Sequence, residues 1–362
     1  MILKQGQERA SPVLFRCDSS QQIGLGHLSR CLGLAKELQE RYGCQIAFAM
    51  RPDPVGNAMV AEGGYPVVML SDGESRGDYS SKFQQVCQSL NVEMVILDVR
   101  DDLPRRTVQS LWEEGRVIVT LDDPTDRRLD VDLAFYPPIP QVKQLDWTGF
   151  KGHLYVGWEW VLLRPEFAQT LPKHPHSFPH VLVTMGGSDP LRMTEKTVKA
   201  LDSLPGAFTV TFVLGRAYGE EKPLQEILSQ ARFTFEIRRD VREMSSLMAE
   251  ADLAIASFGV TAYELAAMGV PGLYLCLTPD HAESATAFEL AGIGQSLGLY
   301  DQVSVPRLAQ AMEALLSDEP RREQLAKQAR QTIDGRGVFR IGEILFTRLS
   351  EKHEFPQTMA TS

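Results

Sequence analysis

The chain has 362 residues, of which 43% are hydrophobic and 23% charged, values typical of a globular protein long enough to form two α/β domains with separate cores. Its formal net charge of −10 and its pI near 5.3, without any basic run interleaved with aromatic residues, argue against a nucleic-acid-binding surface. No apolar run approaches the roughly 20 residues that span a bilayer, so we expect no stable membrane insertion.

In the first part of the chain, short apolar runs alternate with segments of helical periodicity. The runs that predict strands are 13–16, 46–50, 67–70, 94–97 and 117–121. Uniformly apolar strands joined by helices indicate a parallel sheet that is covered on both faces. Asp98 and the pair Asp122-Asp123 follow two of these strands, at the edge where ligands bind in open α/β sheets. For Asp122 and Asp123 individually, we favour the alternative that they cap a helix or form a turn.

The most informative motif, Ile23-Gly24-Leu25-Gly26-His27, lies between the first strand and an amphipathic helix that Gly43 ends. Glycines allow another group to approach the backbone, and the helix N-terminus offers free N–H donors and a partial positive charge. That field disfavours an imidazolium, so we expect His27 to be neutral and able to accept a proton. The alternative is a tight turn whose histidine is only a surface residue.

Two proline-rich stretches, 136–140 and 171–179, interrupt the pattern, and the second is the better domain linker. Beyond it a second series of strands is predicted at 181–185, 209–214, 253–256 and 273–277, and a final helix at about 338–349. The repetition is therefore of a whole doubly wound unit. These patterns predict two such α/β units.

Glycine-rich loops follow two strands of the second series. Gly186-Gly187-Ser188-Asp189 forms a credible anion-binding nest, and the loop 257–261, with Ser257, Gly259 and Thr261, can hold a diphosphate at a helix N-terminus. Glu264 follows in that helix, where a carboxylate can accept hydrogen bonds from both hydroxyls of a ribose. The alternative is a capping-box glutamate three residues after Thr261. The sequence leaves both interpretations open.

Several cofactor classes lack their signatures. The chain has no Walker lysine, and Gly24 and Gly26 are not followed by the third glycine and acidic residue of an NAD-binding motif. The histidines show no zinc spacing, so we expect neither a metal nor a cofactor. The cysteines are odd in number and widely spread, which favours reduced thiols in the cytoplasm. The polar residues 1–11 lack the apolar core of a signal peptide.

Five motifs, in this order, resemble a known family, the UDP-sugar hydrolases of pseudaminic acid biosynthesis, which group with spore-coat polysaccharide biosynthesis proteins. The similarity runs from about residue 13 to about residue 349. The motifs are Arg16-Cys17-Asp18 before Gly24-Leu25-Gly26-His27, Leu162-Leu163-Arg164-Pro165-Glu166-Phe167, Gly186-Gly187-Ser188-Asp189-Pro190, Glu264-Leu265-Ala266-Ala267-Met268-Gly269-Val270-Pro271 and Ile333-Asp334-Gly335-Arg336-Gly337.

The resemblance implies a GT-B-like fold, in which two Rossmann-like doubly wound domains face each other across a cleft. We expect an N-terminal domain at 1–172 on the sugar side, a UDP-binding domain at 173–337, and a C-terminal helix and tail at 338–362 that pack back on the first domain. His27 would activate water. The residues expected to bind the substrate are Arg16, Asp18, Gly24, Gly26, Gly187, Ser188, Ser257, Gly259, Thr261, Glu264 and Glu283.

The implied activity is metal-independent removal of UDP from a UDP-linked 2,4-diacetamido-2,4,6-trideoxy sugar with inversion at the anomeric carbon. Two motifs depart from the family: Glu283 stands in place of an asparagine, and 258–261 replaces a Gly-Gly-Ser-Thr turn. These departures leave the sugar and the acceptor open. The alternatives are an inverting UDP-sugar glycosyltransferase with the same base, and a nucleotide-sugar-binding protein without catalysis. The sequence does not indicate the oligomeric state.

Overall fold

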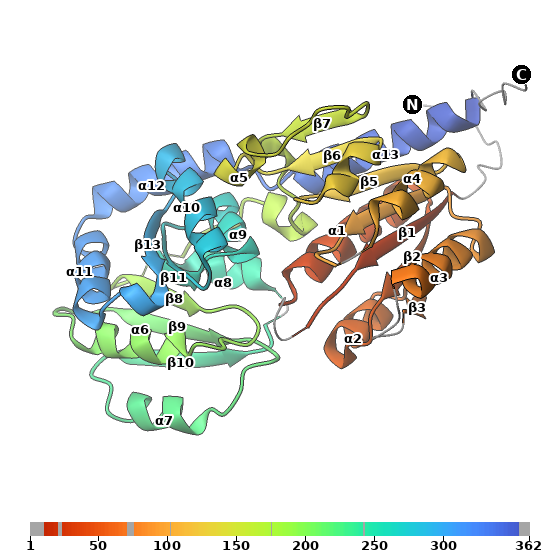
Figure 1. Cartoon of the computed structure of the whole chain (residues 1–362). Coiled ribbons are helices and arrows are strands. Elements are labelled where there is room, and N and C mark those ends of the chain that lie inside the picture. Colours follow the sequence, from red (N-terminus) through yellow and green to blue (C-terminus); the bar gives the residue numbers. More distant parts are fainter. Residues whose placement is uncertain are drawn as a thin grey trace, which may run out of the picture.

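The computed structural model describes residues 11–20, 24–70, 76–101, 103–174, 176–241 and 243–354 (Figure 1). The motif residue Ile23, Pro175 of the predicted linker, the polar segment before residue 11 and the predicted tail after residue 354 lie outside the described residues.

Seven parallel strands form the first sheet, in the order β3-β2-β1-β4-β5-β6-β7. The strands are β1 (Pro12–Cys17), β2 (Gln45–Met50), β3 (Val67–Met69), β4 (Met94–Asp98), β5 (Val117–Leu121), β6 (Leu133–Tyr136) and β7 (His153–Val156). The helices between and beside them are α1 (Gly26–Tyr42), α2 (Pro54–Glu62), α3 (Arg76–Ser89), α4 (Arg105–Glu113) and α5 (Pro140–Lys143). The central strands β1, β4 and β5 are buried on both faces, as their apolar sequences predict.

Six parallel strands form the second sheet, in the order β10-β9-β8-β11-β12-β13. The strands are β8 (His180–Thr184), β9 (Thr209–Leu214), β10 (Thr234–Arg239), β11 (Leu253–Ser257), β12 (Gly272–Cys276) and β13 (Gln295–Leu299). The helices are α6 (Met193–Asp202), α7 (Lys222–Leu228), α8 (Met244–Glu250), α9 (Val260–Met268), α10 (Pro279–Ala291), α11 (Val305–Leu316) and α12 (Glu319–Thr332). The prediction of two doubly wound parallel units is confirmed.

The last helix, α13 (Gly337–Glu354), leaves the second sheet and packs along α1 of the first (Figure 1). One apolar stripe of α13 is fully buried in the same core as β1 and α1. The stripe comprises Val338, Ile341, Leu345 and Leu349. The chain therefore crosses between the sheets twice, and the crossings lie side by side because Gly337 abuts the backbone of Val161.

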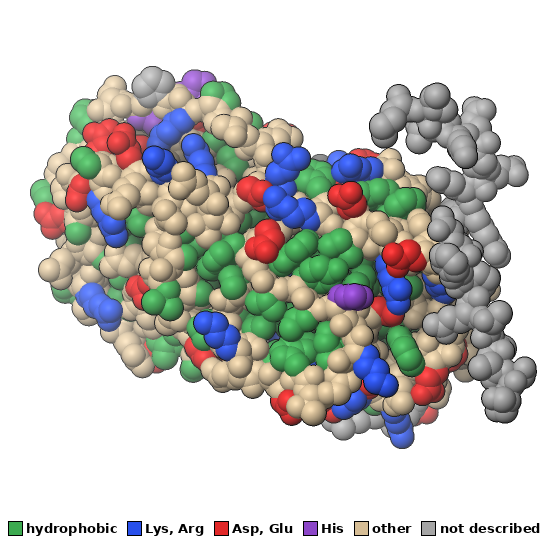
Figure 2. Space-filling model, turned by 90° about the horizontal axis from the view of Figure 1, so that it is seen from above, with side chains coloured by type: hydrophobic (Ala, Val, Ile, Leu, Met, Phe, Trp, Pro, Cys, Tyr) green, Lys and Arg blue, Asp and Glu red, His purple; other side chains and the backbone are tan. Residues whose placement is uncertain are grey.

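The outer edge of the first sheet is exposed. Leu154 and Val156 of β7 are 39% and 41% exposed, and Figure 2, which views the molecule from above β7, shows a cluster of hydrophobic side chains on this face. Charged side chains of both signs are interspersed over the same face (Figure 2). Among the helices of the described residues, none has both the length and the apolar character needed to cross a membrane.

Candidate active site

The loops at the carboxyl ends of the two sheets meet. A methyl group placed on Gly26, at the start of α1, would lie 3.0 Å from Cγ2 of Val260, at the start of α9. A methyl group placed on Gly187, after β8, would lie 3.8 Å from Cδ1 of Leu25. The loop of His27 thus contacts both glycine loops of the second sheet. All three loops were singled out in the sequence, and the structure brings them together.

His27 stands in the first turn of α1 beside a buried carboxylate. Its Nδ1 lies 2.6 Å from Oδ1 of Asp98, the last residue of β4. The two residues meet because β1 and β4 are neighbours, with Cys17 paired to Asp98 in register. From the sequence Asp98 is expected at a ligand-binding edge but has no assigned role, because the order of strands in a sheet is not visible in the sequence.

Arg30 also holds Asp98, and its Nη2 lies 3.1 Å from Nδ1 of His27. Its Nε and Nη2 donate to the two carboxylate oxygens of Asp98, each at 2.6 Å. The Cys31 thiol adds a contact of 3.4 Å to Oδ2. Burial alone would raise the pKa of the Asp98 carboxyl, but the charges and hydrogen bonds of Arg30 and His27 outweigh burial and hold the pKa well below its usual range. Asp98 is therefore an anion at working pH.

The ionised Asp98 fixes the tautomer of His27. A carboxylate only accepts hydrogen bonds, so the proton of the imidazole lies on Nδ1 and the lone pair lies on Nε2. With 22% of its side chain exposed, His27 is accessible to a small molecule in the cleft. This is the arrangement required of a general base that is oriented by a second residue.

Charged and phenolic groups extend the site beyond this pair. Asp122 follows β5 with φ of 55°, and its Oδ2 accepts a hydrogen bond from Arg100 at 2.9 Å. Burial raises the pKa of Tyr263 in α9, Asp122 raises it further, and Arg30 opposes the rise. This tyrosine of the second half of the chain is therefore close enough to charged residues of the first half to feel their electrostatic field. For Asp123 the expectation of a turn is confirmed: its carboxylate accepts from the Thr125 N–H at 2.8 Å. Asp122 instead pairs with Arg100.

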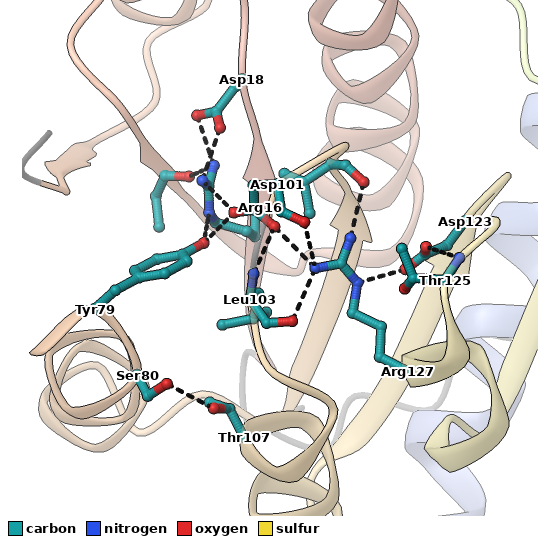
Figure 3. A network of polar contacts seen from close by, with 12 residues as sticks. Arg16, Asp18, Tyr79, Ser80, Asp101, Leu103, Thr107, Asp123, Thr125 and Arg127 are labelled. Carbon is teal, nitrogen blue, oxygen red and sulfur yellow. Dashed lines mark hydrogen bonds and ion pairs between the residues drawn. The ribbon is translucent and has the colours of Figure 1, made fainter. Parts of the chain in front are cut away.

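Arg16 and Asp18 are engaged with partners inside the protein. Arg16 is fully buried, and its five N–H groups donate to partners within the protein (Figure 3). The acceptors are Tyr79 Oη, both oxygens of Asp18, the Ala49 carbonyl and Asp101 Oδ2, at 2.6–3.4 Å. Because every donor is used, the expectation that Arg16 binds substrate is corrected: it is a structural cation, and Asp18 is its counterion.

This network continues beneath the loops that carry Arg100 and Asp122. Asp101 Oδ1 accepts from Nη1 of Arg127 at 2.8 Å, and Nε of Arg127 donates to Asp123 at 2.6 Å (Figure 3). Both Arg127 and Asp123 are almost fully buried. The chain of ion pairs therefore ties the end of β1 to the loops after β4 and β5, and it holds the edge on which Asp98 stands.

The first glycine loop of the second sheet is shaped by its neighbours. Gly186 has φ of 78°, which favours glycine, and Gly215 packs directly against the backbone of Gly187. Asp189 turns away from the loop, because its carboxylate accepts from the N–H groups of Met193 and Thr194 at 2.8 and 2.9 Å and so caps α6. The predicted nest is thus left to Gly186, Gly187 and Ser188.

The second loop leads into α9, which begins at Val260 with Gly259 as its N-cap. Thr261 is already inside the helix, so the capping-box alternative for Glu264 is wrong. Glu264 is 8% exposed, and its Oε1 lies 3.6 Å from Nη2 of Arg164. Burial raises the pKa of Glu264 to about 7; Arg164 opposes this shift and Glu166 adds to it. The side chain is a strong hydrogen-bond acceptor only when it ionises.

Glu283 lies at a second contact between the two halves of the chain, apart from the contact that the glycine loops make. It stands in the second turn of α10, and its Oε1 accepts from Nε2 of Gln144 at 2.7 Å. This partner belongs to the first half of the chain, just beyond α5. Across the residues that the structure describes, no group of three or more His, Cys, Asp or Glu side chains is arranged to hold a metal ion.

No model of a known protein family matches the chain. Its homologues include the spore coat polysaccharide biosynthesis protein SpsG of Bacillus subtilis, which is 24% identical over 336 residues, 91% of this chain and 96% of SpsG. They also include the UDP-2,4-diacetamido-2,4,6-trideoxy-β-L-altropyranose hydrolase of Campylobacter jejuni, which is 24% identical over 280 residues, 76% of this chain and 94% of that enzyme.

Among solved structures, MurG of Acinetobacter baumannii superposes with a TM-score of 0.71 at 16% identity, covering 93% of this chain and 99% of MurG. The calicheamicin glycosyltransferase CalG4 superposes with a TM-score of 0.66 at 18% identity, covering 95% of this chain and 99% of CalG4. At these identities the likeness shows the fold. It is the GT-B-like fold, with two Rossmann-like doubly wound units facing across a cleft.

Proposed function

We propose that the protein is an enzyme of polysaccharide or nonulosonic (pseudaminic-type) acid biosynthesis that hydrolyses a UDP-linked diacetamido-trideoxy sugar. The observation that carries this proposal is the His27–Asp98 pair, which stands beside the contact between the loop 24–26 and two glycine loops of the second sheet. The name of the Campylobacter homologue specifies such a hydrolysis, and the name of the Bacillus homologue specifies polysaccharide biosynthesis. The GT-B-like fold supports a nucleotide-sugar substrate.

In this mechanism Nε2 of His27 takes a proton from water while the water oxygen bonds to the anomeric carbon. The bond between that carbon and the UDP oxygen breaks, and UDP leaves with both electrons. Asp98 keeps the imidazole oriented and balances the charge of the imidazolium that forms. The base contributes about 10²–10⁴-fold in rate. Positioning of the water and of the sugar supplies a further part of the rate enhancement.

The leaving group would be held by the second half of the chain. Gly187 and Ser188 lie in one loop, and Ser257, Gly259 and Thr261 in the other, so backbone N–H groups surround the diphosphate and stabilise its developing charge. Glu264 would accept hydrogen bonds from the ribose. Gly24 and Gly26 would shape the loop of His27. In this assignment residues 1–172 are the sugar-side domain and 173–337 the UDP-binding domain.

The position of the broken bond tests the mechanism. Hydrolysis in ¹⁸O-labelled water is expected to place the label in the free sugar and none in UDP, because the base aims water at carbon and the glycine loops bind the diphosphate as a leaving group. Mass spectrometry of both products measures this. A label in UDP would contradict the role of His27. Turnover that begins only when a sugar acceptor is added would favour the glycosyltransferase alternative.

Glu264→Gln is expected to weaken UDP binding by about 1.5–3 kcal/mol at pH 8, the contribution of hydrogen bonds to a charged group. The difference from the unmodified protein should shrink toward pH 6, where Glu264 (pKa about 7) is largely protonated. Calorimetric titration with UDP at both pH values measures this. Equal affinities at pH 8 would exclude Glu264 as a ribose ligand.

The same variant has a second, opposite effect on stability. The folded protein keeps a proton on Glu264 up to a pKa of about 7, whereas the ordinary value is 4.5, so the free energy of unfolding falls as the pH rises through this window. Gln carries no such penalty, because it does not ionise. The melting temperature of the variant should therefore exceed that of the unmodified protein at pH 8, and by less at pH 5.

A further inference from the structure

The proline-rich stretch that the sequence presents as a break forms a stiff strap. We use this name for residues 137–144, which lead from the end of β6 through α5. Prolines fix φ, so the strap has little conformational freedom, and Pro140 starts α5. Ile139 and Val142 anchor the strap, since both are buried in a cluster that joins the core of the first sheet to Ala287 of α10.

The base of the strap is held on the candidate active-site edge. The hydroxyl of Tyr136, the last residue of β6, donates to the Asp123 carbonyl at 2.6 Å. Its ring meets that of Trp147 edge-on, with centroids 5.5 Å apart. The Arg128 guanidinium lies over the Trp147 ring, 5.1 Å from the centroid of that ring. The strap is therefore fixed relative to the loop after β5.

The tip of the strap reaches across to the second half of the chain. Nε2 of Gln141 donates to the carbonyl and to Oδ1 of Asp280, at 2.9 and 3.0 Å, and it lies 2.8 Å from Oγ of Ser284. Gln144 donates to Glu283 at 2.7 Å. These two glutamines, which we call the clasp, hold the first two turns of α10.

Strand order places the clasp at one end of the cleft. The loop of His27, after β1, faces the loop after β11. The strap, after β6, faces α10, which follows β12. In both sheets this second contact lies farther along the strand order. His281, in the first turn of α10, has its ring 6.4 Å from that of Phe258 in the proposed diphosphate loop. The helix that the clasp holds therefore also packs against the loop 257–261. On the β2–β3 side, Arg216 and Glu62 pair across the two halves at 3.7 Å.

We propose that the clasp selects the nucleophile, because it keeps this end of the cleft closed to any acceptor larger than water. This inference rests on the proposed hydrolysis and specifies its acceptor. With the clasp open, an alcohol can take the place of water: its oxygen bonds to the anomeric carbon, its proton passes to His27, and UDP leaves as before. The clasp residues touch neither the proton nor the bond that breaks, so they determine specificity and not the chemistry.

The test uses the Gln141→Ala/Gln144→Ala double variant. The probe substrate is UDP-2,4-diacetamido-2,4,6-trideoxy-β-L-altropyranose in buffer with glycerol, and the measured quantity is the ratio of glycerol glycoside to free sugar. We expect this ratio to rise at least fivefold in the double variant. Gln109→Ala is the matched control, because Gln109 is an exposed glutamine of α4 whose amide donates only to Glu113 of its own helix among the described contacts. Its ratio should equal that of the unmodified protein.

A second measurement does not depend on turnover. In hydrogen exchange with UDP present, amides of 280–286 are expected to exchange at least tenfold faster in the double variant than in the Gln109→Ala control. An unchanged exchange rate overturns the clasp. An unmodified protein that forms the glycoside as readily as the double variant also overturns it, while hydrolysis stands. If the unmodified protein releases no sugar, the proposed function fails, and the exchange rates alone decide whether the clasp closes the cleft.

Discussion

His27→Asn is expected to lower turnover by at least two orders of magnitude and to leave the affinity for UDP nearly unchanged. Asn has no nitrogen that can accept a proton at the position of Nε2, so the general base is lost, which costs about 10²–10⁴ in rate. The proposed UDP ligands all lie in the other half of the chain. Steady-state rates with the UDP-sugar, together with calorimetric titration of UDP, measure both quantities.

His153→Asn is the matched control for this substitution. His153 is an exposed histidine at the start of the edge strand β7, and its replacement should change neither rate nor affinity. Turnover of the His27 variant at the level of the unmodified protein would remove His27 from the mechanism. Loss of UDP binding in that variant would instead place His27 at the nucleotide.

Asp98→Asn is expected to reduce turnover by about 10²–10⁴-fold, although Asp98 does not reach the substrate. An amide at this position can donate to Nδ1 of His27, and the ring proton then lies on Nε2, where it blocks the transfer from water. The pH profile carries the signature: the residual activity of the variant should rise with hydroxide concentration, because hydroxide needs no general base. Steady-state rates between pH 5 and pH 9 measure this.

Folding of this variant needs a separate check, because Arg30 loses its counterion. Breaking a buried ion pair costs about 3–5 kcal/mol. The melting temperature should therefore fall, while the UDP affinity of the folded fraction is kept. Asp98→Glu restores the charge and should recover part of the rate. Turnover of Asp98→Asn within threefold of the unmodified protein, at equal folded fraction, would contradict an orienting role.

Most interior strands and the edge strand β3 could be predicted from the sequence, whereas the edge strands β7, β10 and β13 could not. β1, β4, β5, β8 and β11 are covered on both faces and are therefore uniformly apolar. β7 and β10 are edge strands with mostly exposed side chains, and their sequences lack that signal. The first proline-rich stretch, taken in the sequence as a break, leads instead into the packed helix α5.

Some parts of the candidate site could likewise be predicted from the sequence, and others could not. The glycine loops could be found because their function depends on local backbone geometry. The partnership of His27 with Asp98 could not be predicted, because the two residues are 71 positions apart in the sequence. They meet only because β1 and β4 are neighbours in the sheet. Arg16 was expected to bind substrate because it belongs to one of the motifs that carry the family resemblance. Only packing reveals that Asp18, Tyr79 and Asp101 already occupy it.

The return of α13 to the first sheet has a consequence for biosynthesis. The apolar stripe of α1, including Leu34 and Leu38, shares its core with Ile341 and Leu345, which the ribosome adds some 300 residues later. During translation the second sheet can close its own core before the first half of the chain is complete. Part of α1 therefore stays uncovered on the nascent first half until α13 has emerged from the ribosome and packs against it.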